Sequence, residues 1–192
     1  MRRHEIVAIG ASAGGVEAII RLVRDLPRDL PAAVFVVIHK PRDHESLLRR
    51  ILSHHGPLTA KYPPQDDAIQ LGTIYVAPSN RTMTLAQGFV GLNGEPAVHF
   101  VRPVVDPLFR SAAKVYGPEV VGIILSGGGR DGAKGLAAIR AAGGITVVQD
   151  PEDAKYPGLP RNAICEDSPD YCLHLNEIAP LIVELAHGRK AR

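Results

Sequence analysis

Unbroken apolar runs that alternate with helical segments constrain the fold of this chain more than any other feature. The runs 6–9, 33–38 and 120–125 contain no polar side chain, as is typical of strands that are buried on both faces. Apolar residues at helical spacing follow the first of these runs, from Val16 to Leu26. Strands that alternate with helices predict the α/β class, with a doubly wound, mostly parallel sheet that carries helices on both faces.

The pattern of the sequence changes between residues 73 and 92. Three short apolar runs, Thr73–Ala77, Met83–Leu85 and Phe89–Leu92, are separated there by turn-forming proline, asparagine and glycine residues. Short runs that lie so close together favour antiparallel strands over strands joined by a crossover helix. We therefore expect a small antiparallel addition to the parallel sheet near residues 73–92.

Composition and charge limit the classes of function that this chain can have. The 192 residues include 22 Lys and Arg against 20 Asp and Glu, a net charge of +2, which argues against nucleic-acid binding by bulk charge. No apolar run reaches the roughly 18 residues of a membrane span, so we expect no membrane insertion and a cytoplasmic location. Cys165 and Cys172 are too few for a disulfide framework or a zinc site. We expect both thiols to be reduced and buried. We also expect the chain to form a single domain over residues 1–192.

In open α/β sheets ligands bind at the carboxyl ends of the strands, so the residues that stand there are the candidates for a functional site. The first run leads into Gly10–Gly15, which reads G-x-S-x-G around Ser12. A sharp turn between a strand and a helix would expose the Ser12 hydroxyl, and a helix N-terminus favours developing negative charge. Two other interpretations compete: Ser12 as an ordinary helix N-cap, and the loop as a dinucleotide-binding fingerprint that has lost its second glycine.

His39 ends the second run directly, and the segment 126–132 follows the third. Beside a serine on the neighbouring strand, His39 fits a general base, although by itself it equally fits an ordinary core histidine. Asp131 fits the orienting acid of a triad or the N-cap of the next helix, and the pattern does not prefer it over Asp150 or Asp106. Glycines 127–129 would bring backbone N–H groups to an oxyanion. The residues alone thus leave a serine hydrolase as one of several interpretations.

Five groups of residues stand in a specific order along the chain. They are Ile6–Gly15, Val37–His39, Arg102–Phe109, Leu125–Ala133, and Gln149–Asp150 with Pro157–Arg161. In this order and spacing, over roughly residues 5–186, the chain closely resembles the catalytic domain of the chemotaxis protein-glutamate methylesterases of the CheB type. Five groups in register are far more specific than one G-x-S-x-G pentapeptide.

The resemblance implies an activity and a set of site residues. That family hydrolyses the γ-glutamyl methyl esters of chemoreceptor helices and releases methanol, and many members also deamidate receptor glutamines. The resemblance implies Ser12 as the nucleophile, His39 as the base and Asp131 as the orienting acid, with backbone N–H groups near Gly128 and Ala13 for the oxyanion. It implies no metal or organic cofactor, and it implies a methylated chemoreceptor or a similar sensory protein as the partner.

The sequence departs from the family pattern at three positions and in its length. Ala13 stands where the family usually has threonine, Gly128 where it usually has methionine, and Lys40 where methionine often follows His39. Members usually carry an N-terminal receiver domain, whereas the first strand here starts within five residues of Met1. We therefore expect no fused receiver, and any regulator on a separate chain.

Two further functions remain as alternatives at this point. The departures are compatible with a catalytically quiet module that binds within a sensory signalling complex. A nucleotide-binding protein is disfavoured, because no acidic residue follows at a strand end, about 20 residues on, to hold a ribose.

Overall fold

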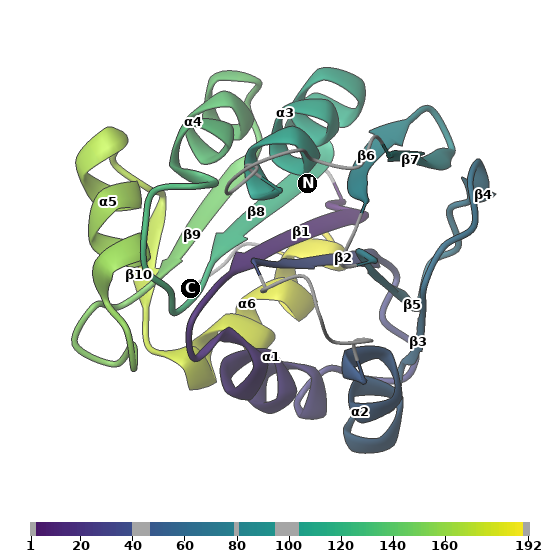
Figure 1. Cartoon of the computed structure of the whole chain (residues 1–192), viewed down its shortest axis with the longest axis horizontal. Coiled ribbons are helices and arrows are strands. Elements are labelled where there is room, and N and C mark those ends of the chain that lie inside the picture. The colour runs from purple at the N-terminus through teal and green to yellow at the C-terminus, as the bar shows by residue number, and fades with distance from the viewer. Residues whose placement is uncertain (1–2, 40–46, 79–80, 95–103, 190–192) are drawn as a thin grey trace.

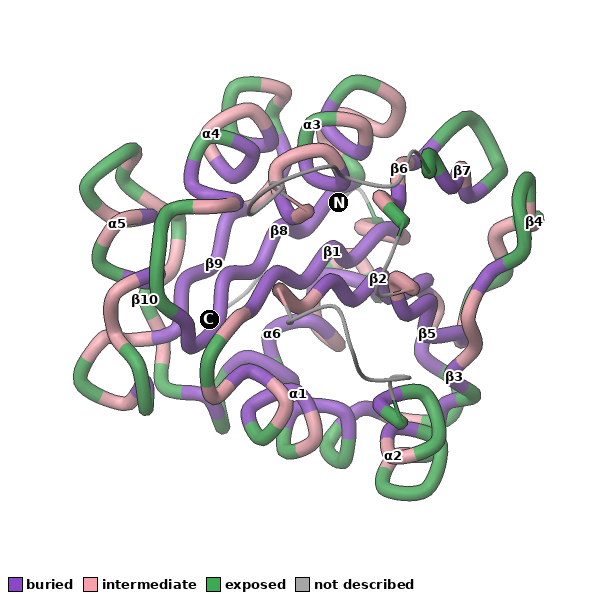
Figure 2. Tube along the Cα trace, in the orientation of Figure 1, coloured by how far each residue is buried: buried purple, intermediate pink, exposed green. Residues whose placement is uncertain are grey.

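A seven-stranded parallel sheet forms the centre of the computed structural model, which describes residues 3–39, 47–78, 81–94 and 104–189 (Figure 1). The strands lie in the order β10-β9-β8-β1-β2-β5-β3, and every neighbouring pair runs parallel. Their bounds are β1 (Ile6–Ala11), β2 (Ala33–Ile38), β3 (Thr59–Lys61), β5 (Thr73–Val76), β8 (Val120–Ile124), β9 (Ile145–Gln149) and β10 (Tyr171–Leu173). The central strands β1 and β8 are buried at every position, as their unbroken apolar runs predict (Figure 2).

Helices cover both faces of the sheet, and each face has its own hydrophobic core. One core contains residues of α1 (Gly15–Arg24), α2 (Leu48–His55) and α6 (Leu175–Ala186). The other contains residues of α3 (Val105–Tyr116), α4 (Ala133–Ala141) and α5 (Gly158–Glu166), and a short 3-10 helix at Gly117–Glu119 leads from α3 into β8. The predicted doubly wound α/β arrangement is confirmed.

A small antiparallel sheet packs beside α3, in the order β4 (Asp67–Ala68), β7 (Phe89–Asn93) and β6 (Thr82–Ala86). The Leu85 N–H donates to the Ser111 hydroxyl of α3 over 3.0 Å, which fixes β6 to that helix. This sheet confirms the antiparallel addition, but the placement of Thr73–Ala77 within it was wrong. Residues 73–76 form β5 of the parallel sheet because all four are buried, and Tyr75 stacks on Phe35 of β2 at 5.1 Å between ring centroids.

The cysteine prediction is corrected in part. Cys165 and Cys172 are unpaired, as expected, but both are exposed rather than buried. Cys172 lies on β10, the last strand of the parallel sheet, and Cys165 lies near the end of α5. An edge strand and the last turn of a helix both leave a small side chain outside the two hydrophobic cores.

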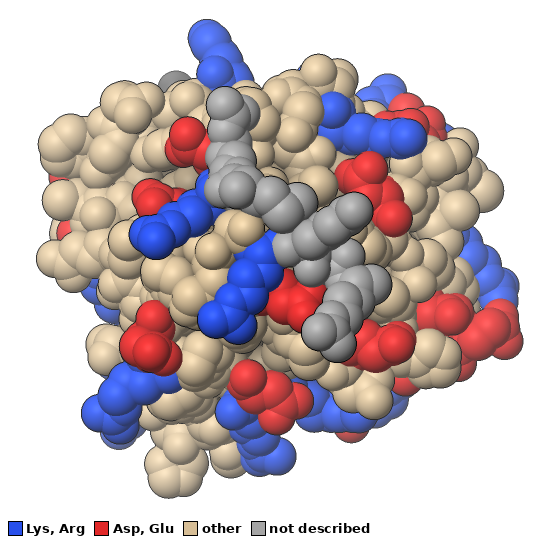
Figure 3. Space-filling model, turned by 180° about the vertical axis from the view of Figure 1, so that it is seen from behind, with Lys and Arg blue, Asp and Glu red and all other residues tan. Residues whose placement is uncertain are grey.

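The surface agrees with the near-neutral composition. On the face shown in Figure 3, basic and acidic side chains are interspersed rather than gathered by sign. Within the described residues, none of the helices combines the length and the apolar character that crossing a bilayer requires.

The order of the strands reverses at β1, and this reversal marks the edge of the sheet where a ligand site is expected. From β1 the chain passes to β2 on one side and later returns to β8 on the other. In doubly wound sheets the crevice at such a reversal, at the carboxyl ends of the strands, is where ligands bind. The loops that follow β1 and β8 lie at this edge, and so does His39, directly after β2.

The buried residue Ser126 connects the loops that follow β1, β8 and β9. It directly follows Leu125 after β8 and is 1% exposed. Its hydroxyl donates to the Ala13 carbonyl over 2.9 Å and accepts from the Tyr156 N–H over 3.0 Å. The Gly127 N–H in turn donates to the Tyr156 carbonyl over 2.9 Å. Two hydrogen bonds from one buried hydroxyl therefore join the loops after β1, β8 and β9.

A second polar chain supports Ser126. The Ser126 N–H donates to Gln149 Oε1 over 2.9 Å, and Gln149 Nε2 donates to Asp153 Oδ2 over 2.8 Å. The same carboxylate accepts from the Leu175 N–H at the start of α6. Burial raises the pKa of Asp153, but the hydrogen bonds from Gln149 and Leu175 and nearby positive charge outweigh it and hold the pKa below its ordinary value. Asp153 is thus an ionised acceptor that fixes the loop after β9.

Replacement of Ser126 with alanine should destabilise the fold by about 1–3 kcal/mol, because the Ala13 carbonyl and the Tyr156 N–H both lose their hydrogen-bond partner, the buried Ser126 hydroxyl. The matched control is Ser53→Ala. The Ser53 hydroxyl also bridges two backbone groups, donating to the Ala60 carbonyl and accepting from the Ala60 N–H, but Ser53 is exposed. Urea denaturation monitored by circular dichroism measures both losses. Equal losses for the two variants would contradict the special position of Ser126.

Candidate active site

Ser12 lies in a tight turn between β1 and α1. The Gly15 N–H donates back to the Ser12 carbonyl over 2.9 Å, and Gly14 has a positive φ of 73°. A Cβ atom at Gly14 would lie 2.8 Å from the Ser126 hydroxyl oxygen, so only glycine fits there. The serine side chain is half-buried. The strand–turn–helix context that gives the G-x-S-x-G pattern its meaning is present.

His39 stands beside Ser12 because of the register of β1 and β2. Ala11 pairs with Ile38 at the ends of the two parallel strands, and the His39 N–H donates to the Ala11 carbonyl over 3.0 Å. Ser12 and His39 are therefore the next residues along two adjacent strands. The His39 side chain is half-buried.

The loop after β8 approaches Ser12 from the other side of β1. The Ser12 N–H donates to the Ser126 carbonyl over 3.1 Å. A Cβ atom at Gly127 would lie 2.9 Å from the Ser12 Cβ and 3.1 Å from its nitrogen. This contact is possible only because residue 127 has no side chain, and it holds the loop of residues 126–131 against the backbone of Ser12.

Asp131 and Asp106 cap each other's helices. The Asp131 carboxylate accepts from the N–H groups of Val104, Val105 and Asp106, at 2.6, 3.0 and 3.1 Å, at the start of α3. The Asp106 carboxylate accepts from the N–H groups of Gly132 and Gly135, at 3.2 and 2.6 Å, at the start of α4. Asp131 was considered as the cap of the helix that follows it. Instead it caps α3, because α3 and α4 start side by side.

The start of α3 in turn lies over the end of β1. A Cβ atom at Gly10 would overlap the Val105 side chain, so Asp131, bonded to the Val105 N–H, lies above the strand that leads to Ser12. Within the described residues no hydrogen bond joins the side chains of Ser12, His39 and Asp131. A carboxylate offers about four acceptor positions, so the three backbone bonds leave Asp131 with capacity for one more donor.

Burial and charge act together on Asp106. Burial raises the pKa of its carboxyl group, the nearby charge of Asp131 raises it further, and these effects outweigh the hydrogen bonds from Gly135 and Gly132 and the charge of Arg110. The Asp106 carboxyl group therefore lies at a helix N-terminus with a pKa above its ordinary value. The orienting acid of the predicted triad, Asp131, has a titrating neighbour.

Two exposed backbone N–H groups flank Ser12. Among the hydrogen bonds of the described residues, neither the Ala13 N–H nor the Gly128 N–H has a protein acceptor, and both residues are exposed. A Cβ atom at Gly128 would meet nothing within 4 Å, so a side chain could begin there without a close contact at its first carbon. Lys40, the third departure from the family pattern, lies outside the described residues.

The sequence did not predict the roles of Ser126 and Asp106, although they stand within the groups Leu125–Ala133 and Arg102–Phe109. The signal for Ser126 was a polar residue directly after the most apolar strand of the chain. The signal for Asp106 was an aspartate in the first turn of a predicted helix, which favours interaction with a helix N-terminus. Neither signal identifies the partner, which comes from another segment.

Replacement of Gly127 with alanine should slow the phosphonylation of Ser12 by a fluorophosphonate probe on the order of a hundredfold. The added methyl group would displace the Ser12 backbone by several tenths of an ångström or more, and such displacements are costly in catalysis. Gly128→Ala is the matched control in the same loop, since its methyl group meets open space and the N–H is kept. Equal rates for the two variants would contradict the close contact between residue 127 and Ser12.

Asp106 should make the stability of the protein depend on pH. Because its folded pKa is raised above the ordinary 3.8, the protonated form is the stabilising one. That contribution is present below the unfolded pKa and is lost as pH rises through the folded pKa. Asp106→Asn cannot ionise and keeps an acceptor for the Gly135 N–H. The melting temperature of this variant should therefore increase relative to that of the wild type as pH rises from about 4.

The alanine variant separates capping from titration. Asp106→Ala removes the acceptor and should cost about 1–2 kcal/mol across that whole pH range, as measured by thermal denaturation. A difference between Asp106→Asn and the wild type that does not change with pH would contradict the raised pKa.

Comparisons with known proteins agree with this geometry. Residues 7–182 match the family model of the CheB methylesterases. The chain is 38% identical over 183 residues to "Protein-glutamate methylesterase/protein-glutamine glutaminase 2" of Anaeromyxobacter dehalogenans, covering 95% of this chain and 54% of that protein. It is 35% identical over 182 residues to the corresponding protein of Pyrococcus horikoshii, covering 93% and 50%. The chain thus spans about half the length of these relatives.

A solved structure and a shorter relative complete the comparison. The crystal structure of the Thermotoga maritima CheB methylesterase catalytic domain matches with a TM-score of 0.86 and 30% identity, over 96% of this chain and all of that one. A "putative" protein-glutamate methylesterase/protein-glutamine glutaminase of Leptospira interrogans is 36% identical, with 95% of both chains covered. The chain belongs to the CheB methylesterase family.

Proposed function

We propose that this chain is a serine esterase that hydrolyses glutamate γ-methyl esters on a chemoreceptor or a related sensory protein and releases methanol. The observation that carries the proposal is the β1–β2 register, which sets Ser12 and His39 on adjacent strand ends. Relatives of this chain are named protein-glutamate methylesterase/protein-glutamine glutaminase, which is the reaction that such a pair would perform.

In the first half of the reaction, His39 takes the proton of the Ser12 hydroxyl while the oxygen attacks the ester carbonyl carbon. The carbonyl oxygen gains negative charge, and the N–H groups of Ala13 and Gly128 would donate hydrogen bonds to it. As the tetrahedral intermediate collapses, the bond to the methoxy group breaks. His39 returns its proton to that group, and methanol leaves a glutamyl ester on Ser12.

In the second half, water takes the place of methanol. His39 accepts a proton from water as the oxygen attacks the acyl-enzyme, and it then returns the proton to the Ser12 oxygen. The product is a free glutamate carboxylate and an unmodified serine. The same steps on a glutamine side chain release ammonia in place of methanol, so deamidation needs no further catalytic group.

Asp131 orients His39 in this scheme. Its carboxylate is held by the three N–H groups at the start of α3 and keeps capacity for the imidazole N–H. A fixed, ionised carboxylate would select the tautomer of His39 that can accept the serine proton, and it would stabilise the imidazolium that forms. We also propose a cytoplasmic location for this chain.

Methanol release from methylated receptors, compared between the wild type and Ser12→Ala, tests the proposal. The wild type should release methanol, and Ser12→Ala should lose at least about a thousandfold in rate, because removal of a catalytic serine leaves only the contribution of the oxyanion site and substrate binding. Fluorophosphonate labelling should occur at Ser12 and be slowed strongly in His39→Ala.

Two results would reject the esterase. One is full methanol release by Ser12→Ala. The other is an intact fold with no fluorophosphonate labelling of the wild type, which would instead support a catalytically quiet binding module in a sensory complex.

A further inference from the structure

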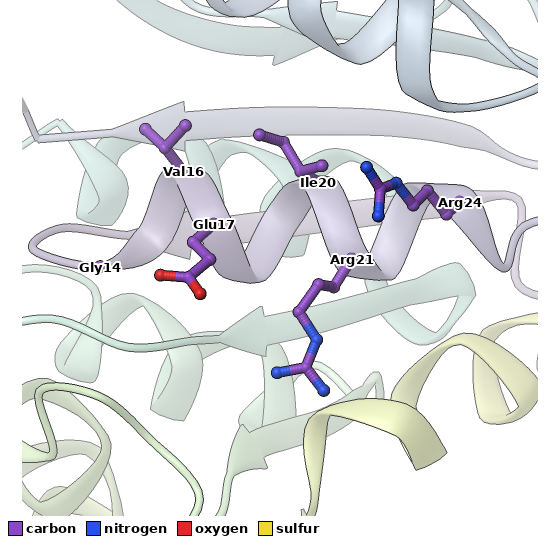
Figure 4. Close-up of a pocket in the computed structure, with 6 residues that line it drawn as sticks. All are labelled: Gly14, Val16, Glu17, Ile20, Arg21 and Arg24. Carbon is purple, nitrogen blue, oxygen red and sulfur yellow. The ribbon is translucent and has the colours of Figure 1, made fainter.

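A groove of about 550 Å³ runs along the outer side of α1. It is lined by Gly14, Val16, Glu17, Ile20, Arg21 and Arg24 (Figure 4). Its first residue stands two positions after Ser12, and α1 extends ten residues from there, or about 15 Å at the rise of an α-helix. The groove therefore begins close to Ser12 in the sequence and extends away from it along one helix.

The groove has an apolar edge and a charged edge. Val16 and Ile20, four residues apart and both half-buried, lie along one edge with Arg24 beyond them, while Glu17 and Arg21 lie along the other (Figure 4). Apolar residues at this spacing, flanked by charges, form the kind of seam on which a second helix packs.

The charges of the groove that lie outside any ion pair are positive, and one of them, Arg21, also acts at longer range on Asp153, whose pKa it helps to lower. The Glu17 carboxylate is already paired with Lys155 at 3.1 Å. Arg24 donates to His55 Nδ1 over 3.0 Å, which leaves its charge uncompensated. Among the ion pairs of the described residues, neither Arg21 nor Arg24 has a carboxylate partner within 4 Å, and both are exposed.

We infer that this groove docks an acidic amphipathic α-helix, the segment of the substrate protein that carries the glutamyl ester. The inference rests on the proposed function and adds to it the surface that selects the substrate. An extended peptide would need an unpaired sheet edge for its backbone, and a helix face such as α1 offers none. A helix satisfies its own backbone and needs only the apolar seam and the two guanidinium groups.

Tyr156 marks the end of the groove nearest to Ser12. Its ring is half-exposed, at 47%, and a Cβ atom at Gly14 would lie 2.9 Å from its Cδ2. Its backbone is held on both sides, by the Ser126 hydroxyl and by the Gly127 N–H. Its ring, beside Gly14 at the start of the groove, would offer a contact surface for the aliphatic part of the glutamyl side chain as it leaves the docked helix.

Two helical peptides test the inference. Each carries one central glutamate γ-methyl ester and the same apolar stripe, and the flanking positions are glutamate in one peptide and lysine in the other. The measured quantity is the ratio of kcat/KM for the acidic over the basic peptide, in which any general change of activity cancels. The wild type should favour the acidic peptide by about tenfold, and Arg21→Glu with Arg24→Glu should invert the ratio.

Two further variants control the result. Arg21→Gln with Arg24→Gln should give a ratio near one. That result would show that the groove selects the peptide by its charge and not by its shape. Lys114→Glu changes the sign of an exposed charge on α3, on the opposite face of the sheet, and should keep the wild-type ratio. An equal ratio in the wild type and in the Arg21→Glu, Arg24→Glu variant would overturn the docking groove.

Failure of the groove and failure of the esterase give different results. Binding of the acidic ester peptide to Ser12→Ala, followed by fluorescence anisotropy, needs no turnover and should weaken about tenfold when Arg21→Glu and Arg24→Glu are added. If the wild type hydrolyses p-nitrophenyl acetate but binds both peptides equally, the groove is rejected and the esterase stands. If it does not hydrolyse p-nitrophenyl acetate but binds the acidic peptide selectively, the groove stands and the esterase is rejected.

Discussion

The hydrogen-bonded ladder of β1 between β2 and β8 is the constraint on which the rest of the structure depends. Its register sets His39 beside Ser12 on one side, and on the other side it brings the loop after β8 to the Ser12 backbone. The approach of this loop needs backbone without side chains, at Gly14 and Gly127. The position of the candidate nucleophile therefore follows from strand pairing and from two glycines, and not from contacts of the serine side chain.

The aspartate pair shows how one element serves both the fold and the site. Asp131 and Asp106 exchange caps between α3 and α4, which positions the predicted orienting acid above β1 by backbone bonds alone. The helix N-termini favour the negative charge, while burial and mutual repulsion raise the pKa of Asp106. Asp131 is thus held by backbone bonds beside a carboxyl group with a raised pKa, and the charge of Asp131 is one cause of that increase.

The sequence predicts the features that depend on local pattern and leaves out those that depend on the meeting of distant segments. Apolar runs predict β1, β2 and β8, and the G-x-S-x-G loop marks Ser12. The placement of β5 in the parallel sheet depends on the stacking of Tyr75 on Phe35, and two residues 40 apart in sequence carry no local signal for it. The exchange of caps is equally invisible, because Asp131 looks like the cap of its own helix until α3 is placed beside α4. The five motif groups, taken together, indicated the family where no single motif did.

The rate of Ser12 phosphonylation in a double-mutant cycle of His39→Ala and Asp131→Asn tests most directly whether the three residues act as one unit. If Asp131 acts only through His39, its replacement should slow the wild type strongly and leave His39→Ala unchanged within about twofold. If the two losses multiply, Asp131 serves the fold at the start of α3 and not the histidine, and the account of the site is contradicted.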